Sequence, residues 1–140
     1  MKLNTNNIIS SLCIIVGGIC LSACQESIGE RLERETQEYT RKNCPQKFDA
    51  EGSIILDSLV FHNDGKNEYV YHYSLQHELA MPETFSQMRD ELNTSLLNGI
   101  KNSAELRHIK DEGMTLKYVY YDASTHKVVA SFRFTKEDYE

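Results

Sequence analysis

Hydrophobic residues recur along the first two thirds of the chain at spacings typical of helices. Between residues 26 and 42 a thin apolar stripe with i, i+4 spacing runs through a highly charged segment, and this predicts an amphipathic helix. Pro45 ends that helix, because proline disfavours helical backbone in the residue before it. Pro82 suits the first turn of a second helix over residues 82–102. The apolar face of the second helix contains Phe85, Met88, Leu92, Leu96 and Ile100.

Four other segments are rich in β-branched and aromatic residues and predict strands at 52–61, 67–75, 114–121 and 127–134. A short turn joins the strands of each pair, and Asp64-Gly65 in the first turn is a strong hairpin signal. The predicted order is therefore α-β-β-α-β-β. We expect an α+β fold in which two helices cover one face of a four-stranded antiparallel sheet.

Strict alternation in three of the strands predicts which side chains face the helices. In the segment 54–56 residues of both parities are apolar, so alternation does not decide which of its side chains face the helices. The residues expected to face the helices are Tyr69, Tyr71, Tyr73, Leu75, Leu116, Tyr118, Tyr120, Val128, Ala130, Phe132 and Phe134.

The N-terminus has the features of a bacterial export signal. Lys2 is its one charge, and an apolar core runs over residues 8–21. That core is shorter than the roughly 20 residues that a membrane-spanning helix needs, and Gly17 and Gly18 interrupt it.

Leu21-Ser22-Ala23-Cys24 resembles the lipobox of bacterial lipoproteins. The resemblance implies that the thiol of Cys24 is acylated and that the chain is cleaved before it. Several acyl chains anchor a protein firmly, because each buried CH₂ contributes about 0.8 kcal/mol. Gln25 stands where an Asp would resemble an inner-membrane retention signal. We therefore expect a protein of the bacterial cell envelope, anchored by lipid in the outer membrane and facing the periplasm.

These signals predict three parts: a signal peptide at 1–23, a lipidated tether and N-terminal helix at 24–44, and 45–140 as the remainder of a single α+β domain that includes that helix. The whole chain carries a net charge of −6. Residues 1–23 contain one basic and no acidic residue, so their removal leaves a charge of −7. An acidic surface argues against nucleic acid as a partner.

The residues that most often carry chemistry form no recognisable motif. After cleavage Cys44 is the one cysteine besides Cys24, and it is expected to be buried or paired with another chain. The five histidines have no metal-ligand spacing, and the chain contains neither a G-x-S-x-G motif nor a glycine-rich phosphate loop. We expect no metal, no cofactor and no enzymatic activity.

Three further motifs resemble a group of small exported bacterial proteins without characterised function. They are C-P-x-x-x-D at 44–49, Y-x-Y-x-L at 71–75 and G-x-T-L-x-Y-x-Y at 113–120. The resemblance covers roughly residues 30–138 and implies the fold and the compartment only.

The strand tyrosines have two interpretations. They are either cross-strand pairs packed under the helices or a platform that binds sugar or peptide. If a binding site exists, the alternation favours the open face of the sheet, where His72, Lys117, Tyr121 and Arg133 are expected to project.

The leading hypothesis is a non-catalytic membrane-anchored lipoprotein whose domain binds another envelope protein, in an accessory, inhibitory or immunity role. The alternative is a small-ligand or glycan-binding module that uses the sheet tyrosines. A small hydrolase comes third. Dimerisation through the open face is a further alternative and would make that face structural.

Overall fold

The computed structural model describes residues 25–140. The predicted signal segment and Cys24 lie outside these residues. The observed elements follow the predicted order, with short additions. They are α2 (Ile28–Asn43), β1 (Gln46–Lys47), β2 (Ile54–His62), β3 (Glu68–Leu75), the 3₁₀ helix η2 (His77–Ala80), α3 (Pro82–Asn102), α4 (Arg107–Asp111), β4 (Thr115–Asp122), β5 (Val128–Phe134) and α5 (Lys136–Tyr139).

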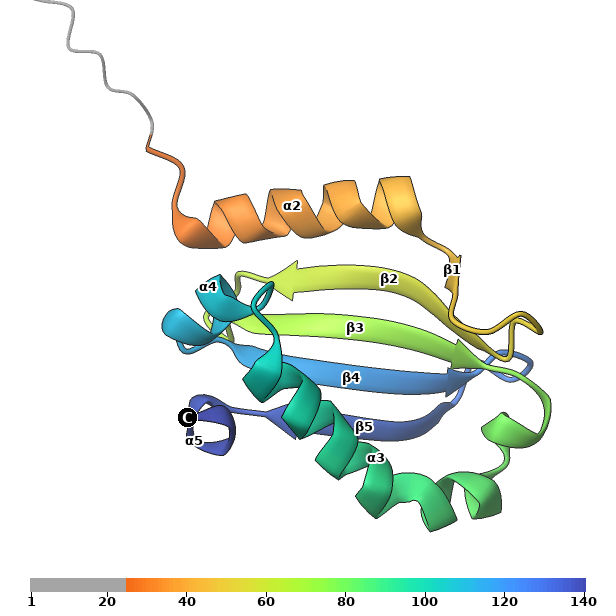
Figure 1. Cartoon of the computed structure of the whole chain (residues 1–140). Helices are drawn as coiled ribbons and strands as arrows, with labels where there is room; N and C mark the ends of the chain where they lie inside the picture. The colour runs from red at the N-terminus through yellow and green to blue at the C-terminus, as the bar shows by residue number, and fades with distance from the viewer. Residues whose placement is uncertain (1–24) are drawn as a thin grey trace, which may run out of the picture.

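The α+β class is confirmed, but the prediction of a four-stranded antiparallel sheet is wrong. The sheet has five strands in the order β1-β2-β3-β4-β5, and β3 and β4 run parallel (Figure 1). The reason is the connection: α3 lies between β3 and β4 in the chain and returns it to the starting end of the sheet, as a parallel crossover requires. The short β1 adds the fifth strand at the edge beside β2.

Helices α2 and α3 pack on the same face of the sheet, as predicted. Their buried residues, Leu32 of α2 and Phe85 and Ile100 of α3, join one hydrophobic core with the strands. Most of the predicted helix-facing strand residues belong to this core or pack against it. Val128 does not, because a register shift between Tyr120 and Tyr121 leaves it exposed at the end of β5.

A bulge at Asp57 determines which side chains of β2 face the helices. Leu56 lies opposite Tyr73 and Ser58 lies opposite His72, so Asp57 is an extra residue in the ladder. The extra residue lets apolar residues on both sides of the bulge, such as Leu56 before it and Leu59 after it, face the helices. Simple alternation would turn one of the two outward.

Helix α2 is held at the edge of the sheet rather than across its middle. The Thr40 hydroxyl donates to the carbonyl of Leu59 at 2.8 Å and accepts from the Leu59 amide at 2.9 Å. The buried Thr36 hydroxyl accepts from the amide of Phe61 at 3.2 Å. These bonds satisfy the outer edge of β2 beyond the reach of the two-residue β1.

Contacts are also formed at the start of α2 and at the end of α3. The first turn of α2 lies against the β2–β3 turn, where a Cβ added to Gly29 would meet the exposed side chain of Asn63. At the end of α3, the Lys110 ammonium donates to the carbonyls of Ile100, Lys101 and Ser103 at 2.9, 2.9 and 3.1 Å. A cation at a helix C-terminus also interacts favourably with the helix dipole.

Replacing Thr40 by Val should destabilise the protein by about 1–3 kcal/mol, because the amide and carbonyl of Leu59 lose their partner at a half-buried edge. The measurement is urea unfolding followed by circular dichroism. Thr94→Val is the matched control, since the Thr94 hydroxyl is exposed and bonds within its own helix to the carbonyl of Asp90. Equal unfolding midpoints for the two variants would show that the edge bonds do not hold α2.

Candidate functional site

Five tyrosines of the two central strands form a continuous row on the helix-covered face. The parallel register places Tyr71 beside Tyr118 and Tyr73 beside Tyr120. The Tyr71 and Tyr118 rings are stacked with centroids 4.8 Å apart, and those of Tyr73 and Tyr120 are 5.1 Å apart. We call this set the tyrosine row; its members are Tyr69, Tyr71, Tyr73, Tyr118 and Tyr120.

The hydroxyls of the tyrosine row have no hydrogen-bond partner among residues 25–140. The tyrosine hydroxyls that do form such bonds in this part of the chain are those of Tyr39, Tyr121 and Tyr139. No buried side-chain oxygen or nitrogen of the described residues lacks a partner. The five row hydroxyls must therefore reach solvent, although their rings pack on or within the core.

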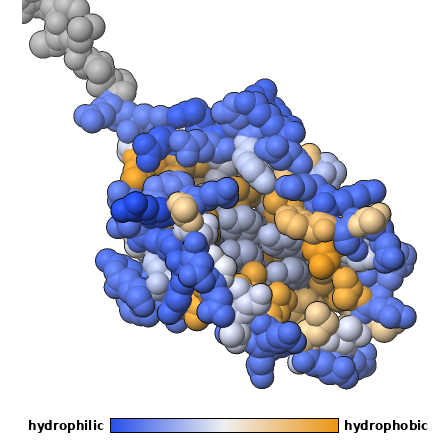
Figure 2. Space-filling model, in the orientation of Figure 1, coloured by the Kyte–Doolittle hydropathy of each residue, from blue (hydrophilic) through white to orange (hydrophobic). Residues whose placement is uncertain are grey.

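An apolar pocket continues the row toward the end of β3. Its volume is about 240 Å³, and Tyr73 and Tyr120 form part of its wall. In Figure 2, hydrophobic and weakly polar side chains come to the surface between two hydrophilic margins, where Figure 1 shows α2 and α3. The full lining is Phe48, Ile54, Tyr73, Leu75, Leu79, Thr84, Phe85, Met88, Leu92 and Tyr120. The pocket and the tyrosine row together are called the inter-helix site.

Exposed hydrophobic side chains surround this site. Phe48 is 56% exposed and its ring lies 5.7 Å from that of Tyr73, while Met88 on α3 is 44% exposed. On the α2 side Tyr39 is 38% exposed and donates to the side-chain oxygen of Gln46 at 3.2 Å. The site is thus open to solvent and bordered by apolar and aromatic groups on both sides.

The row tyrosines stay neutral far into the alkaline range. Burial, followed by the charge of Glu35, raises the pKa of Tyr69 to about 12, and burial followed by the proximity of Tyr39 raises that of Tyr73 to about 12. Burial and neighbouring tyrosines raise the pKa values of Tyr71, Tyr118 and Tyr120 as well. At physiological pH the site therefore presents neutral hydroxyls that can both donate and accept.

The predicted open-face residues do lie on the face opposite the helices. There the Tyr121 hydroxyl and the Nδ1 atom of His72 are hydrogen-bonded at 3.3 Å, and their rings are stacked. Arg133 pairs with Glu68 at 3.2 Å and lies opposite Lys117 in the ladder. Burial, with the charges of His62 and Lys117, lowers the pKa of His72. The polar groups of His72, Tyr121 and Arg133 thus bind one another or their neighbours, in contrast to the tyrosine row.

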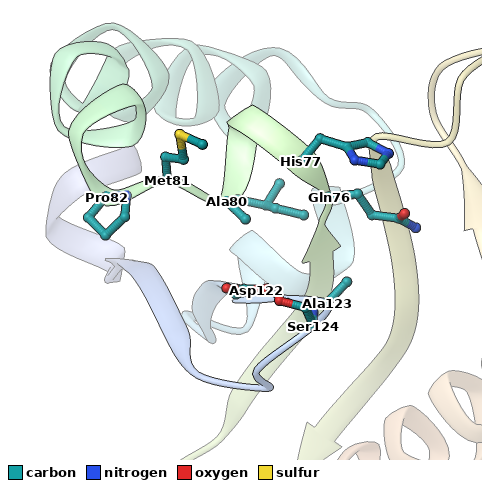
Figure 3. A pocket seen from close by; sticks show the side chains of 9 residues that line it. Gln76, His77, Ala80, Met81, Pro82, Asp122, Ala123 and Ser124 are labelled. Carbon is teal, nitrogen blue, oxygen red and sulfur yellow. Dashed lines mark hydrogen bonds between the residues drawn. The ribbon is translucent and has the colours of Figure 1, made fainter.

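A second cavity of about 710 Å³ lies between η2 and the β4–β5 turn (Figure 3). Figure 3 shows Gln76 and His77 on one side of it and Asp122 and Ser124 on the other. The Asp122 carboxylate accepts bonds from the Ser124 amide and hydroxyl at 2.8 and 2.6 Å, which lower its pKa. One oxygen of this carboxylate, Oδ1, is thus bonded within its own turn.

The remaining chemical residues do not assemble into a centre. Within residues 25–140 no group of three His, Cys, Asp or Glu side chains could hold a metal ion. The thiol of Cys44 is half-buried, and burial followed by the charge of Asp57 raises its pKa, which makes it a poor nucleophile.

Sequence reasoning identified the tyrosines but missed the pocket beside them. Phe48 and Leu79 belong to a loop and a 3₁₀ turn, which have no periodicity to show where they pack. An aromatic residue in a polar loop, as at Phe48, was the one available signal.

Comparisons with known proteins give a family and a fold. The model of the family described as "Domain of unknown function (DUF8479)" matches residues 27–130. No curated protein matches the chain. The crystal structure of a Pseudomonas aeruginosa protein predicted to be secreted superposes with a TM-score of 0.68 at 18% identity, over 80% of this chain and 92% of that one. That likeness shows a shared fold. No helix of residues 25–140 is long and apolar enough to cross a membrane.

The raised tyrosine pKa values predict alkaline destabilisation. An unfolded tyrosine ionises near pH 10, whereas Tyr69 and Tyr73 in the folded protein ionise at about 12. Their contribution to stability is complete below pH 10 and is lost as the pH rises from 10 to 12, because ionisation then favours the unfolded chain. Urea unfolding midpoints should fall over this interval, and near-ultraviolet tyrosinate absorbance should lag behind that of the unfolded chain.

The double variant Tyr69→Phe/Tyr73→Phe is the control, since it should reduce the fall of the midpoint above pH 10. If the folded wild type shows every tyrosine ionising near pH 10, the described burial of the row is wrong.

Proposed function

The chain belongs to the DUF8479 family, and we propose that it is a non-catalytic envelope lipoprotein that binds another envelope protein through the inter-helix site. The observation that carries this proposal is the tyrosine row, whose hydroxyls have no partner among residues 25–140 and open to solvent beside an apolar pocket. Binding sites typically combine apolar lining with a few placed polar groups and aromatic side chains.

The envelope location rests on the N-terminal sequence. Leu21-Ser22-Ala23-Cys24 matches the lipobox pattern, and α2 begins at Ile28, four residues after Cys24. Ser27 caps that helix in a capping box with Glu30, so the domain's first helix begins close to the proposed lipid attachment residue in the sequence. A protein with the same fold is predicted to be secreted, which agrees with export. Gln25 favours the outer membrane as the site of attachment.

The binding surface in this proposal differs from the one favoured by alternation. The open-face set of His72, Lys117, Tyr121 and Arg133 stays a prediction. The inter-helix site is the better candidate because its polar groups are unbonded, whereas those of His72, Tyr121 and Arg133 already have partners in the domain.

A glycan or small ligand on the tyrosines is the second candidate. The same free hydroxyls favour it, since they could bind the hydroxyls of a sugar as well as a polypeptide backbone. The two candidates differ in what is captured from cells, because a glycan-binding module would not retain one protein in constant proportion.

The proposal is tested by mild crosslinking of the full-length protein in cells, followed by purification and mass spectrometry. We expect one dominant partner protein in near-stoichiometric amount. Met88→Gln should lower its capture about tenfold, because it puts a polar amide at the wall of the pocket.

Met81→Gln is the matched control. Met81 is 50% exposed, close to the 44% of Met88, but it lines the other cavity. Cys24→Ser, which removes the proposed lipid, should also reduce capture. Recovery of only bystander lipoproteins, or equal loss of the partner in Met81→Gln and Met88→Gln, contradicts the proposal. Crosslinking of the chain to itself alone would replace it with a homodimer.

A further inference from the structure

We infer that the occupant of the inter-helix site is a polypeptide segment that places one large apolar side chain in the pocket, bonds its backbone to the tyrosine row and carries flanking Lys or Arg residues. This inference rests on the proposed function and names the chemistry of the partner.

The size of the pocket fits an anchor side chain rather than a whole ligand. Its volume of about 240 Å³ is below the roughly 300 Å³ at which small-molecule sites begin. No charged residue lines it, and the side chains at its mouth, Phe48 and Met88, are both exposed. A single Phe, Leu or Met side chain would fill such a space and be desolvated by these two residues.

The stacking within the row argues against a sugar. A sugar ring packs its C–H bonds on the open face of an aromatic ring. The faces of Tyr71 and Tyr118 cover each other, since these rings are stacked with an angle of 3° between their planes. Tyr73 and Tyr120 are stacked in the same way at 14°. The ring faces turned toward each other within these pairs are therefore not available to a sugar.

The hydroxyls in turn argue against an acyl chain. A lipid tail across the row would remove five hydroxyls from water and offer none of them a partner. Leaving a buried polar group unpaired is unfavourable. A polypeptide backbone supplies both N–H and C=O groups along its length, so it can satisfy a line of hydroxyls that donate and accept.

The charges around the pocket predict the flanking residues. Two segments, 46–56 and 77–92, supply most of its lining, and their acidic residues outnumber their lysines and arginines. Of the two basic residues, Arg89 already lies 5.0 Å from the ring of Phe132 and donates to the carbonyl of Ser131. That leaves Lys47 against Asp49, Glu51, Glu78 and Glu83, since Asp90 and Glu91 line a separate hollow on α3. Cationic residues beside the anchor would be attracted to this rim, and the attraction should weaken with salt.

The test is a titration of the purified Cys24→Ser protein with peptides, a sugar and a fatty acid, in which NMR records the chemical shifts of the backbone amides. The main probes are acetylated peptide amides of sequence Lys-Ser-Ala-Xaa-Ala-Ser-Lys, with Phe, Leu or Ala at Xaa. A fourth peptide keeps Phe and replaces both lysines by Glu. Chitotetraose and decanoate represent the glycan and the acyl chain.

We expect the Phe or Leu peptide to shift the amides of the pocket and the row, with a Kd about tenfold lower than that of the Ala and Glu-flanked peptides. Added salt should weaken the binding of the lysine-flanked peptide. Met88→Gln should weaken it as well, and Met81→Gln should not.

Three results would overturn the inference: equal binding of the Phe and Ala peptides, tighter binding of chitotetraose or decanoate at the same amides, or no peptide binding. If no peptide binds but cells still yield a partner that Met88→Gln loses, the proposed function stands and only the inferred chemistry of the partner segment is wrong. If peptides bind as expected but no partner is captured, the function in the cell is wrong.

Discussion

The hydrogen bonds of Thr36 and Thr40 to the edge of β2 determine how the rest of the structure is arranged. They attach α2 along the sheet edge, where unpaired amides and carbonyls would otherwise face solvent. Because α2 is held at the edge and α3 packs toward β5, the row on β3 and β4 keeps access to solvent between them (Figure 1).

This arrangement gives the tyrosines two roles at once. Their rings supply core contacts and stack in register across a parallel strand pair, while their tips stay available. Phenylalanine would serve the packing equally well and would avoid a polar group at a half-buried position. The proposed function gives a reason for five tyrosines with unbonded hydroxyls, which packing alone does not require. The high pKa values follow from the same burial and keep these groups neutral.

Much of the fold could be predicted because local pattern and tertiary structure agree. The helical stripes, the alternation from Tyr69 to Leu75 and the Asp64-Gly65 turn each indicated the element that forms. The parallel pairing of β3 and β4 could not be read from alternation, which is the same for either direction. The bulge at Asp57 is equally invisible in a segment that is apolar at both parities.

The candidate site was predicted in part. Composition and spacing identified the tyrosines and His72, Lys117, Tyr121 and Arg133, but not which face has unsatisfied groups. Whether a polar group is satisfied depends on its hydrogen-bond partner, and the two can lie far apart in the sequence, as Glu68 and Arg133 do. Thr36 and Thr40 appear in the sequence as ordinary polar residues of a charged helix, and their bonds to β2 follow only from the packed structure.

The most direct test of the central claim compares the stability and the binding of the double variant Tyr71→Phe/Tyr73→Phe. Removing hydroxyls that have no partner within the domain should leave the free energy of unfolding unchanged or slightly raised. The same change should sharply reduce capture of the partner protein from cells. A large loss of stability with unchanged capture would show that these hydroxyls serve the fold and that the site lies elsewhere.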